Sequence, residues 1–379
     1  MRDLINTACY IHIPFCDHKC IYCDFYSIIK LENVDRFLSA LKKEIQFYSK
    51  KYSETRKLIS IYFGGGTPSL MNPEYLREII SFIKSEFKVD DEAEITMETN
   101  PGTVNKEKLI AFRTAGINRI SIGIQSLNND ELKFLTRIHN SETAVETVNA
   151  AKLAGFENIS IDLIFNLPGQ TKEKWLHNLN KAVELPIDHI SAYSLILERG
   201  TILNKMVLDK KVIMQDDDYD ADLYETTIDF LTNRGFYQYE VSNFTKPGYE
   251  CLHNNVYWKH GEYFGFGTSA HSFINKKRWW NLSSAKMYID EVEINRNAVA
   301  GSELISEGEA FEEYLMLALR GSGIMIDELS KKYNGDWLIK NFSYFENLSK
   351  EGYVNINQNR IWLTKKGYAV CDEIIKNLS

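Results

Sequence analysis

The sequence has no long apolar run and no excess of positive charge. Lys and Arg number 44 against 52 Asp and Glu, so the net charge is −8. Phosphate binding needs concentrated positive charge, so a general nucleic-acid surface is disfavoured. No stretch approaches the roughly 20 apolar residues that span a bilayer. The N-terminal segment MRDLINTACYIHIPF is interrupted by Asp3 and Asn6 and lacks the apolar core of a signal peptide. We therefore expect a cytoplasmic protein without a transmembrane segment.

Cysteine is also scarce, and half of it is clustered. Three of the six cysteines, Cys16, Cys20 and Cys23, fall within eight residues, whereas the others are scattered. Disulfides are disfavoured in reducing compartments, so clustered cytosolic cysteines more often bind metal or react. A fourth thiol could sit two positions after Cys23, but Phe25 stands there. The cluster therefore indicates a metal site with three protein thiolates.

Two kinds of metal site remain open for these thiols. Structural zinc normally has four protein ligands, for which His12 or His18 would have to supply the fourth. Three thiolates without a fourth ligand are typical of an iron–sulfur cluster in which one iron has no protein ligand.

The first two-thirds of the chain alternates short β-branched runs with amphipathic stretches. We predict strands in ACYIHI, LISIYF, EITME, RISIGI, ISIDLIF and HISAYSLI, and helices beginning near Val34, Pro73, Lys106, Ser141 and Thr171. Six strand–helix repeats predict an α/β fold with a parallel sheet and helices outside it. Polar or glycine-rich segments (PFC, GGGTP, ETNPG, GIQSL and NLPGQ) follow the first five strands. Enzymes of this class place their sites at these strand ends.

The pattern changes after about residue 197. A helix is expected over 216–233, then a strand-like YQYEVSNF and an aromatic-rich region that contains CLHNNVYW. From about residue 306, three helices, a two-strand wing and a final helix predict a small winged-helix-like module. We therefore divide the chain into a core (1–235), a connecting region (236–305) and a C-terminal module (306–379).

The stretch YIHIPFCDHKCIYCDF resembles the cluster loop of radical S-adenosylmethionine (radical SAM) proteins, whose pattern is C-x3-C-x2-C. This resemblance implies a partial (β/α)6 barrel in which Cys16, Cys20 and Cys23 hold a [4Fe–4S] cluster. The fourth iron would chelate SAM. FGGGTPSL resembles the glycine motif of that superfamily, and Glu98 resembles its SAM-binding carboxylate, although alone it would suit a turn salt bridge or a helix cap.

Three further residues narrow the resemblance to one family within the superfamily: Gln125, Arg137 and Asp162. Each alone suits a structural role: a turn partner, a surface charge and a cap. Together they match positions that bind a second SAM in the family of oxygen-independent coproporphyrinogen III oxidases (HemN) and related heme chaperones (HemW). Further SAM-binding positions match at Tyr10, Tyr22, Gly65, Gly66 and Thr67.

Two sequence motifs resemble those of the chaperones rather than those of the oxidases. The oxidases carry a further cysteine where this chain has Phe25, and HNNVYW matches a heme-associated HNxxYW signature. The first strand is expected almost at the start of the sequence, so we also expect the N-terminal extension typical of the oxidases to be missing. The resemblance implies His253 as a heme ligand beside Tyr257 and Trp258, with Cys251 as an alternative and His260 and His271 as weaker ones. Without it, His253 would suit a core histidine.

We therefore expect a heme chaperone that carries a [4Fe–4S] cluster and SAM and delivers heme to an acceptor hemoprotein, which can be membrane-associated. The alternative is an oxidase that decarboxylates the propionates of coproporphyrinogen III by SAM-radical chemistry. A zinc-stabilised structural protein is the third possibility.

Overall fold

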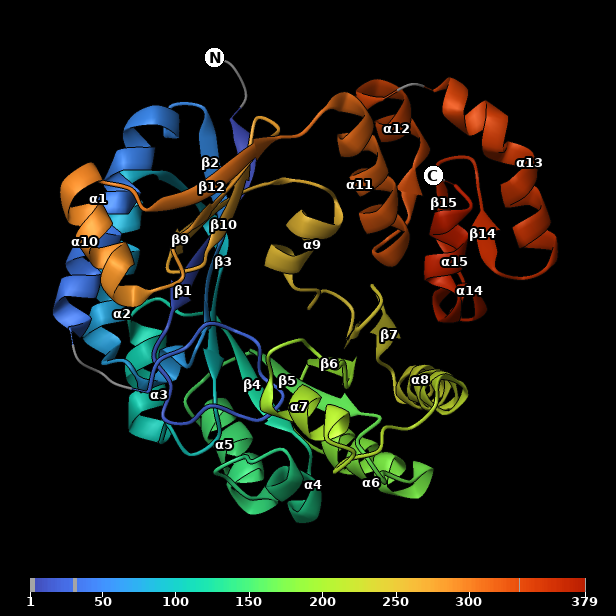
Figure 1. Cartoon of the computed structure of the whole chain (residues 1–379), viewed down its shortest axis with the longest axis horizontal. Helices are drawn as coiled ribbons and strands as arrows, with labels where there is room; N and C mark the ends of the chain where they lie inside the picture. Colours follow the sequence, from blue (N-terminus) through green and yellow to red (C-terminus); the bar gives the residue numbers. More distant parts are fainter. Residues whose placement is uncertain (1–3, 30–32, 334, 379) are drawn as a thin grey trace.

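The computed structural model describes residues 4–29, 33–333 and 335–378. Six parallel strands lie side by side in chain order (Figure 1). They are β1 (Ile5–Ile13), β2 (Arg56–Gly65), β3 (Lys88–Thr99), β4 (Arg119–Gln125), β5 (Asn158–Phe165) and β6 (His189–Ser194). The intervening helices are α1 (Val34–Tyr52), α2 (Pro73–Glu86), α3 (Lys106–Thr114), α4 (Asn129–Phe134), α5 (Ser141–Leu153) and α6 (Lys172–Val183), with a 3-10 turn at Pro68–Leu70. The six strand–helix repeats expected from the sequence are confirmed; only the short α4 was not foreseen.

Local signals in the sequence explain where these helices begin. The side chains of Asn72, Asn105, Asn140 and Thr171 each accept a hydrogen bond from a backbone N–H in the first turn of the helix that follows. Such caps satisfy N–H groups that have no partner within the helix. The helices pack buried apolar side chains against the strands in one continuous core. This packing leaves the opposite face of the curved sheet free to line a cavity.

Beyond β6 the chain extends the same sheet at both edges. After α7 (Ile202–Leu208) and α8 (Asp217–Thr232), β8 (Asn243–Thr245) pairs antiparallel with β6, and β7 (Tyr237–Gln238) pairs with β8. YQYEVSNF is thus two short strands with a turn between them. At the other edge β9 (Glu262–Gly267) lies parallel to β1, followed by β10 (His271–Ile274), β11 (Lys277–Asn281) and β12 (Val299–Leu304). The result is an open twelve-stranded arc.

The connecting region shares the core of the sheet, whereas the C-terminal module has its own. Phe264, Trp279 and Tyr288, on β9, β11 and α10 (Ala285–Asn295), belong to the main core. A separate core forms among the C-terminal elements (orange to red in Figure 1). These are α11 (Glu307–Arg320), β13 (Ile324–Met325), α12 (Ile326–Lys332), α13 (Asp336–Lys350), β14 (Val354–Ile356), β15 (Arg360–Leu363), α14 (Lys365–Ala369) and α15 (Cys371–Lys376). The expected hairpin is present, with β13 as a third strand. The three-part division remains a prediction.

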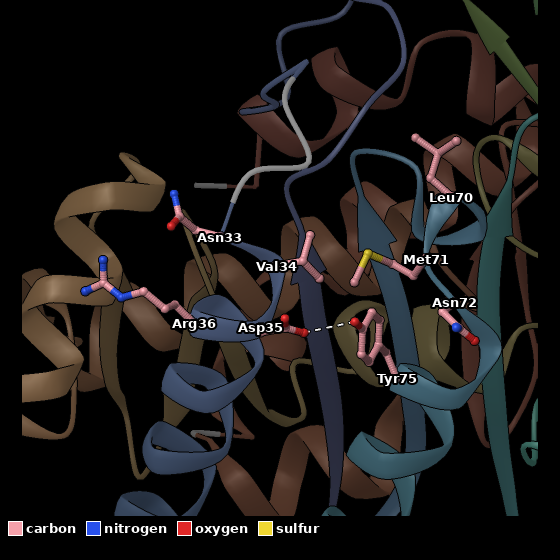
Figure 2. A pocket seen from close by; sticks show the side chains of 8 residues that line it. All are labelled: Asn33, Val34, Asp35, Arg36, Leu70, Met71, Asn72 and Tyr75. Atoms are coloured by element: carbon pink, nitrogen blue, oxygen red, sulfur yellow. Dashed lines mark hydrogen bonds between the residues drawn. The ribbon is translucent and has the colours of Figure 1, made fainter.

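Two further features bear on function. In the described part of the chain, no helix is both long and apolar enough to cross a membrane. A cavity of about 520 Å³ lies where α1 and α2 begin, and there the Tyr75 hydroxyl donates a 2.9 Å hydrogen bond to Asp35 (Figure 2). None of the residues that line it is among the candidate site residues.

Candidate functional site

An open cavity of about 1010 Å³ lies at the carboxyl ends of the parallel strands. The loop after β1, the ends of β2 to β6, and residues of α8, α14 and α15 line it. All three clustered cysteines border it, together with most of the predicted SAM residues: Tyr22, Gly65, Gly66, Thr67, Glu98, Gln125, Arg137 and Asp162. Parallel strands bring their carboxyl ends to one edge, which explains why segments so distant in sequence meet here.

The loop that carries the cysteines is anchored to the glycine-rich turn after β2. The backbone N–H of Gly66 donates to the carbonyl of Ile13 at 2.8 Å, and that of Thr67 donates to the carbonyl of Phe15 at 2.7 Å. A Cβ atom at position 66 would lie 2.6 Å from the Phe15 oxygen, so only glycine fits. The expectation from the sequence was that these glycines admit SAM. The contacts show that Gly66 first of all admits the cysteine loop.

The three thiols are half-buried and unbridged. The Sγ atom of Cys16 lies 3.4 Å from Oγ1 of Thr67, and Nη1 of Arg137 donates to Sγ of Cys20 at 3.5 Å. Burial raises the pKa of Cys23 to about 11. The Cys23 thiol therefore has to give up a proton when metal binds, since metal binding releases the protons of its ligands.

The donor set fits a cluster better than a single zinc ion. Among the described residues, no three His, Cys, Asp or Glu side chains gather at the spacing of one ion. The ring nitrogens of His12 face the Tyr10 hydroxyl at 3.2 Å and the Tyr26 carbonyl at 3.0 Å. Each thiolate of a [4Fe–4S] cluster binds a different iron, so its ligands lie farther apart around a common cavity. Three thiols on one cavity wall match that requirement.

Glu98 is the next-to-last residue of β3 and lines the cavity beside the glycine turn. Its carboxylate accepts hydrogen bonds from the Tyr62 hydroxyl at 3.0 Å and from the backbone N–H of Gly65 at 3.2 Å. Burial, reinforced by the nearby Asp162, raises the pKa of Glu98 to about 7. The part of the cavity wall beside the glycine turn therefore carries a carboxyl group whose charge changes close to neutral pH.

The second predicted set lies on β4, β5 and the loop after α4. Gln125, with φ of 69°, closes β4, and Asp162 accepts a 3.1 Å hydrogen bond from Ser121. Nη2 of Arg137 donates to the carbonyl of Gly123 at 2.8 Å and to Oδ1 of Asn100 at 2.6 Å. Arg137 is therefore a fixed guanidinium that faces a cysteine, and its expected role as a surface charge, taken alone, does not apply.

The HNNVYW motif lies in a short helix, α9 (Leu252–Trp258; Figure 1). This helix packs against β2. The buried carboxylate of Glu94 accepts hydrogen bonds from the backbone N–H groups of Leu252 at 2.9 Å and His253 at 3.2 Å. Cys251, fully buried, donates its thiol to Glu94 at 3.4 Å. The start of the motif is thus fastened to β3.

His253 points into the protein and is 2% exposed. Nδ1 lies 3.0 Å from Oγ of Ser60, and Nε2 lies 2.9 Å from the hydroxyl of Tyr257. Its ring stacks on Tyr62 at 4.8 Å, and burial lowers its pKa to about 3, so the imidazole is neutral. In this conformation neither ring nitrogen is free for iron, and of this motif only Asn254 reaches the large cavity.

The other heme candidates take structural positions here. Trp258 packs against Gly321 at the end of α11, where a Cβ would lie 2.8 Å from the Trp258 side chain. His260 pairs with Glu313 of α11 at 3.1 Å, and the exposed His271 stacks on Trp280. These contacts tie the connecting region together and to the C-terminal module.

Three residues that make key contacts here are not among those predicted from the sequence: Asn100, Glu94 and Ser60. Asn100 lies two residues after Glu98, so the strand-end rule could have found it. Glu94 and Ser60 lie in strand interiors, where nothing local reveals that a helix 158 residues after Glu94 and 193 residues after Ser60 packs on them.

Comparison with known proteins places the chain in a family. Residues 10–182 match the model of the radical SAM superfamily. The heme chaperone HemW of Bacillus subtilis is 34% identical over 97% of this chain and 97% of its own length; HemW of Haemophilus influenzae is 42% identical over 72% of this chain and 71% of its own. The structure of Escherichia coli coproporphyrinogen III oxidase (HemN) has a TM-score of 0.83, covers 99% of this chain and 90% of its own, and is 23% identical, which shows the fold alone. By its close match to these relatives over nearly its whole length, the chain belongs to the HemW heme chaperone family of the radical SAM superfamily.

Proposed function

We propose that this protein binds heme and passes it to an acceptor hemoprotein, with a [4Fe–4S] cluster and SAM bound beside the cysteine loop. Membership of the radical SAM superfamily assigns the cluster and SAM to the chain. Cys16, Cys20 and Cys23 are the proposed cluster ligands, and the strand-end residues are the proposed SAM contacts. The cluster leaves one iron open for the amino and carboxylate groups of SAM.

The observation that favours a carrier over an oxidase is the charge of the cavity. Three carboxylates from α8 and α15 line it: Asp217, Asp220 and Asp372. Its two arginines are engaged already: Arg137 with Asn100, and buried Arg119 beside Glu94 at 3.9 Å. Coproporphyrinogen III carries more propionates than heme, so these carboxylates disfavour it more strongly, and Lys19 is the one other cationic residue among those that line the cavity. A porphyrinogen substrate therefore suits this cavity poorly.

The side chain of Phe25 also favours a carrier over an oxidase. It is 59% exposed at the mouth of the cavity, where the oxidase branch has a further cysteine. A large exposed apolar side chain beside a cofactor site favours contact with an apolar ligand or partner.

Two parallel assays on anaerobically reconstituted protein test the proposal. Heme titration is expected to give a saturable Soret shift at one heme per chain. SAM, reductant and coproporphyrinogen III are expected to yield no protoporphyrinogen, with Cys20→Ser as the variant that lacks a complete ligand set. Turnover above that variant would overturn the carrier in favour of the oxidase, and absence of heme binding would overturn it outright.

The heme ligand is tested separately. If His253 binds iron, His253→Ala and His253→Gln lose the Soret shift, whereas His177→Ala, which removes an exposed histidine on α6, keeps it. Identical heme binding by all four proteins would remove His253 from the ligand set. The cytoplasmic location and the acceptor hemoprotein, membrane-associated or not, remain predictions.

A further inference from the structure

Asn100 links two segments that touch different cysteines. Its Nδ2 donates to Oγ1 of Thr67 at 2.9 Å, and its Oδ1 accepts from Nη2 of Arg137 at 2.6 Å. Thr67 is thus matched by a donor and Arg137 by an acceptor, and the single planar side-chain amide of Asn100 supplies both. Thr67 follows β2 and Arg137 follows α4, so this amide joins parts of the chain that are 70 residues apart.

Thr67 and Arg137, the two partners of Asn100, each contact a cysteine thiol. Because the Thr67 hydroxyl accepts from Asn100, its own O–H is available to donate to Sγ of Cys16, 3.4 Å away. Arg137 has its Nη2 occupied by Asn100 and by the Gly123 carbonyl, which aims Nη1 at Sγ of Cys20 at 3.5 Å. Thr67, Asn100 and Arg137 therefore form one hydrogen-bonded bridge, called here the Thr67–Asn100–Arg137 bridge, from Cys16 to Cys20.

The Asn100 side chain is not explained by the turn in which it sits. The turn after β3 is closed by backbone groups, since the Thr103 N–H donates to the Asn100 carbonyl at 3.2 Å. The Asn100 N–H lies 3.4 Å from Oγ of Ser69. The side-chain amide faces the cavity instead and lines it.

We propose that Asn100 is a positioning residue for the [4Fe–4S] cluster, which acts through Thr67 and Arg137 on the sulfurs of Cys16 and Cys20. Hydrogen bonds to cluster sulfurs raise the reduction potential, and partners beyond the ligands hold the ligands in place. The bridge serves two of the three thiols and leaves Cys23 outside it. Asn100 thus sets both cluster retention and cluster potential. This inference rests on the proposal that these cysteines hold the cluster.

The test compares Asn100→Ala with Asn118→Ala in the full chain. Asn118, just before β4, makes two similar side-chain hydrogen bonds, with Ala93 and Ile95 of β3, and no hydrogen bond to a cysteine. Both variants therefore lose a comparable set of bonds. Asn100→Asp keeps the acceptor for Arg137 but loses the donor to Thr67.

Three quantities are measured after anaerobic reconstitution: iron per chain, the rate at which a chelator bleaches the cluster absorption, and the midpoint potential from an EPR-monitored redox titration. We expect Asn100→Ala to lose its cluster about 10-fold faster and to have a lower potential. Asn100→Asp should bleach at an intermediate rate, and Asn118→Ala should match the wild type.

The measurements distinguish failure of the positioning role from failure of the cluster assignment. If the wild type holds iron and Asn100→Ala matches Asn118→Ala in bleaching rate and potential, the positioning role is overturned while the cluster assignment stands. If the wild type takes up no iron, the cluster assignment fails and the role of Asn100 fails with it.

Discussion

Nδ1 of His253 lies 3.0 Å from Oγ of Ser60 in the middle of β2, so the histidine of the HNNVYW motif is held inside the protein. The other ring nitrogen faces Tyr257, and the helix that carries both begins on the carboxylate of Glu94. Movement of α9 away from β2 would expose this imidazole to a macrocycle. If His253 binds heme, uptake is therefore coupled to the opening of this helix.

Weakening the cap of α9 should speed heme uptake if His253 is the ligand. Glu94→Gln keeps an acceptor oxygen but removes the charge that faces two backbone N–H groups. Loss of a cap costs about 1 kcal/mol, which corresponds to roughly a fivefold larger open population. Stopped-flow Soret kinetics should show a similarly faster association. Glu92→Gln, exposed on the same strand, is the control. Unchanged kinetics in both variants would argue against the coupling.

Ser60→Ala should destabilise the fold by about 1–3 kcal/mol, because Nδ1 of His253 is left buried without its partner. Urea unfolding of the apo protein measures this change. Ser85→Ala removes an exposed hydroxyl that bonds only a carbonyl in its own helix, and should change stability by less than about 0.5 kcal/mol. A wild-type midpoint for Ser60→Ala would mean that His253 turns to another partner.

Gly66→Ala should dislodge the cysteine loop, because the new Cβ would meet the Phe15 carbonyl oxygen at 2.6 Å. We expect a stability loss of about 1–3 kcal/mol. Iron per chain after reconstitution should fall well below that of the wild type. Gly308→Ala, in the first turn of α11 with open space around it, should leave both quantities unchanged. Full iron occupancy in Gly66→Ala would show that the turn and the loop are not coupled.

The half-buried carboxyl of Glu98, which lines the cavity, predicts a pH dependence of stability. Burial raises its pKa from 4.5 to about 7 in the folded protein. Between these values the folded state binds more protons than the unfolded state, so the free energy of unfolding falls as pH rises from about 4.5 to 7. Glu98→Gln should flatten that fall relative to the wild type, whereas Glu92→Gln should not. Urea titrations of the apo protein across this range measure it, and equal slopes for the three proteins would contradict it.

The sequence by itself determined the six parallel strand–helix repeats, the C-terminal helices and hairpin, and the spacing of the cysteines. These features depend on local periodicity, capping residues and strand-end composition, which a chain carries in short windows. The meeting of Glu98 and Gln125 at one edge followed in outline from the parallel order of the strands.

Only the tertiary structure decided what surrounds His253 and what the glycine turn touches. Ser60 and Glu94 lie far from His253 in sequence, and nothing near the motif encodes them as its partners. The same holds for β9, which returns from residue 262 to pair beside β1, and for the Thr67–Asn100–Arg137 bridge. Such contacts depend on how distant segments pack, and packing is a property of the whole fold rather than of any window of the chain.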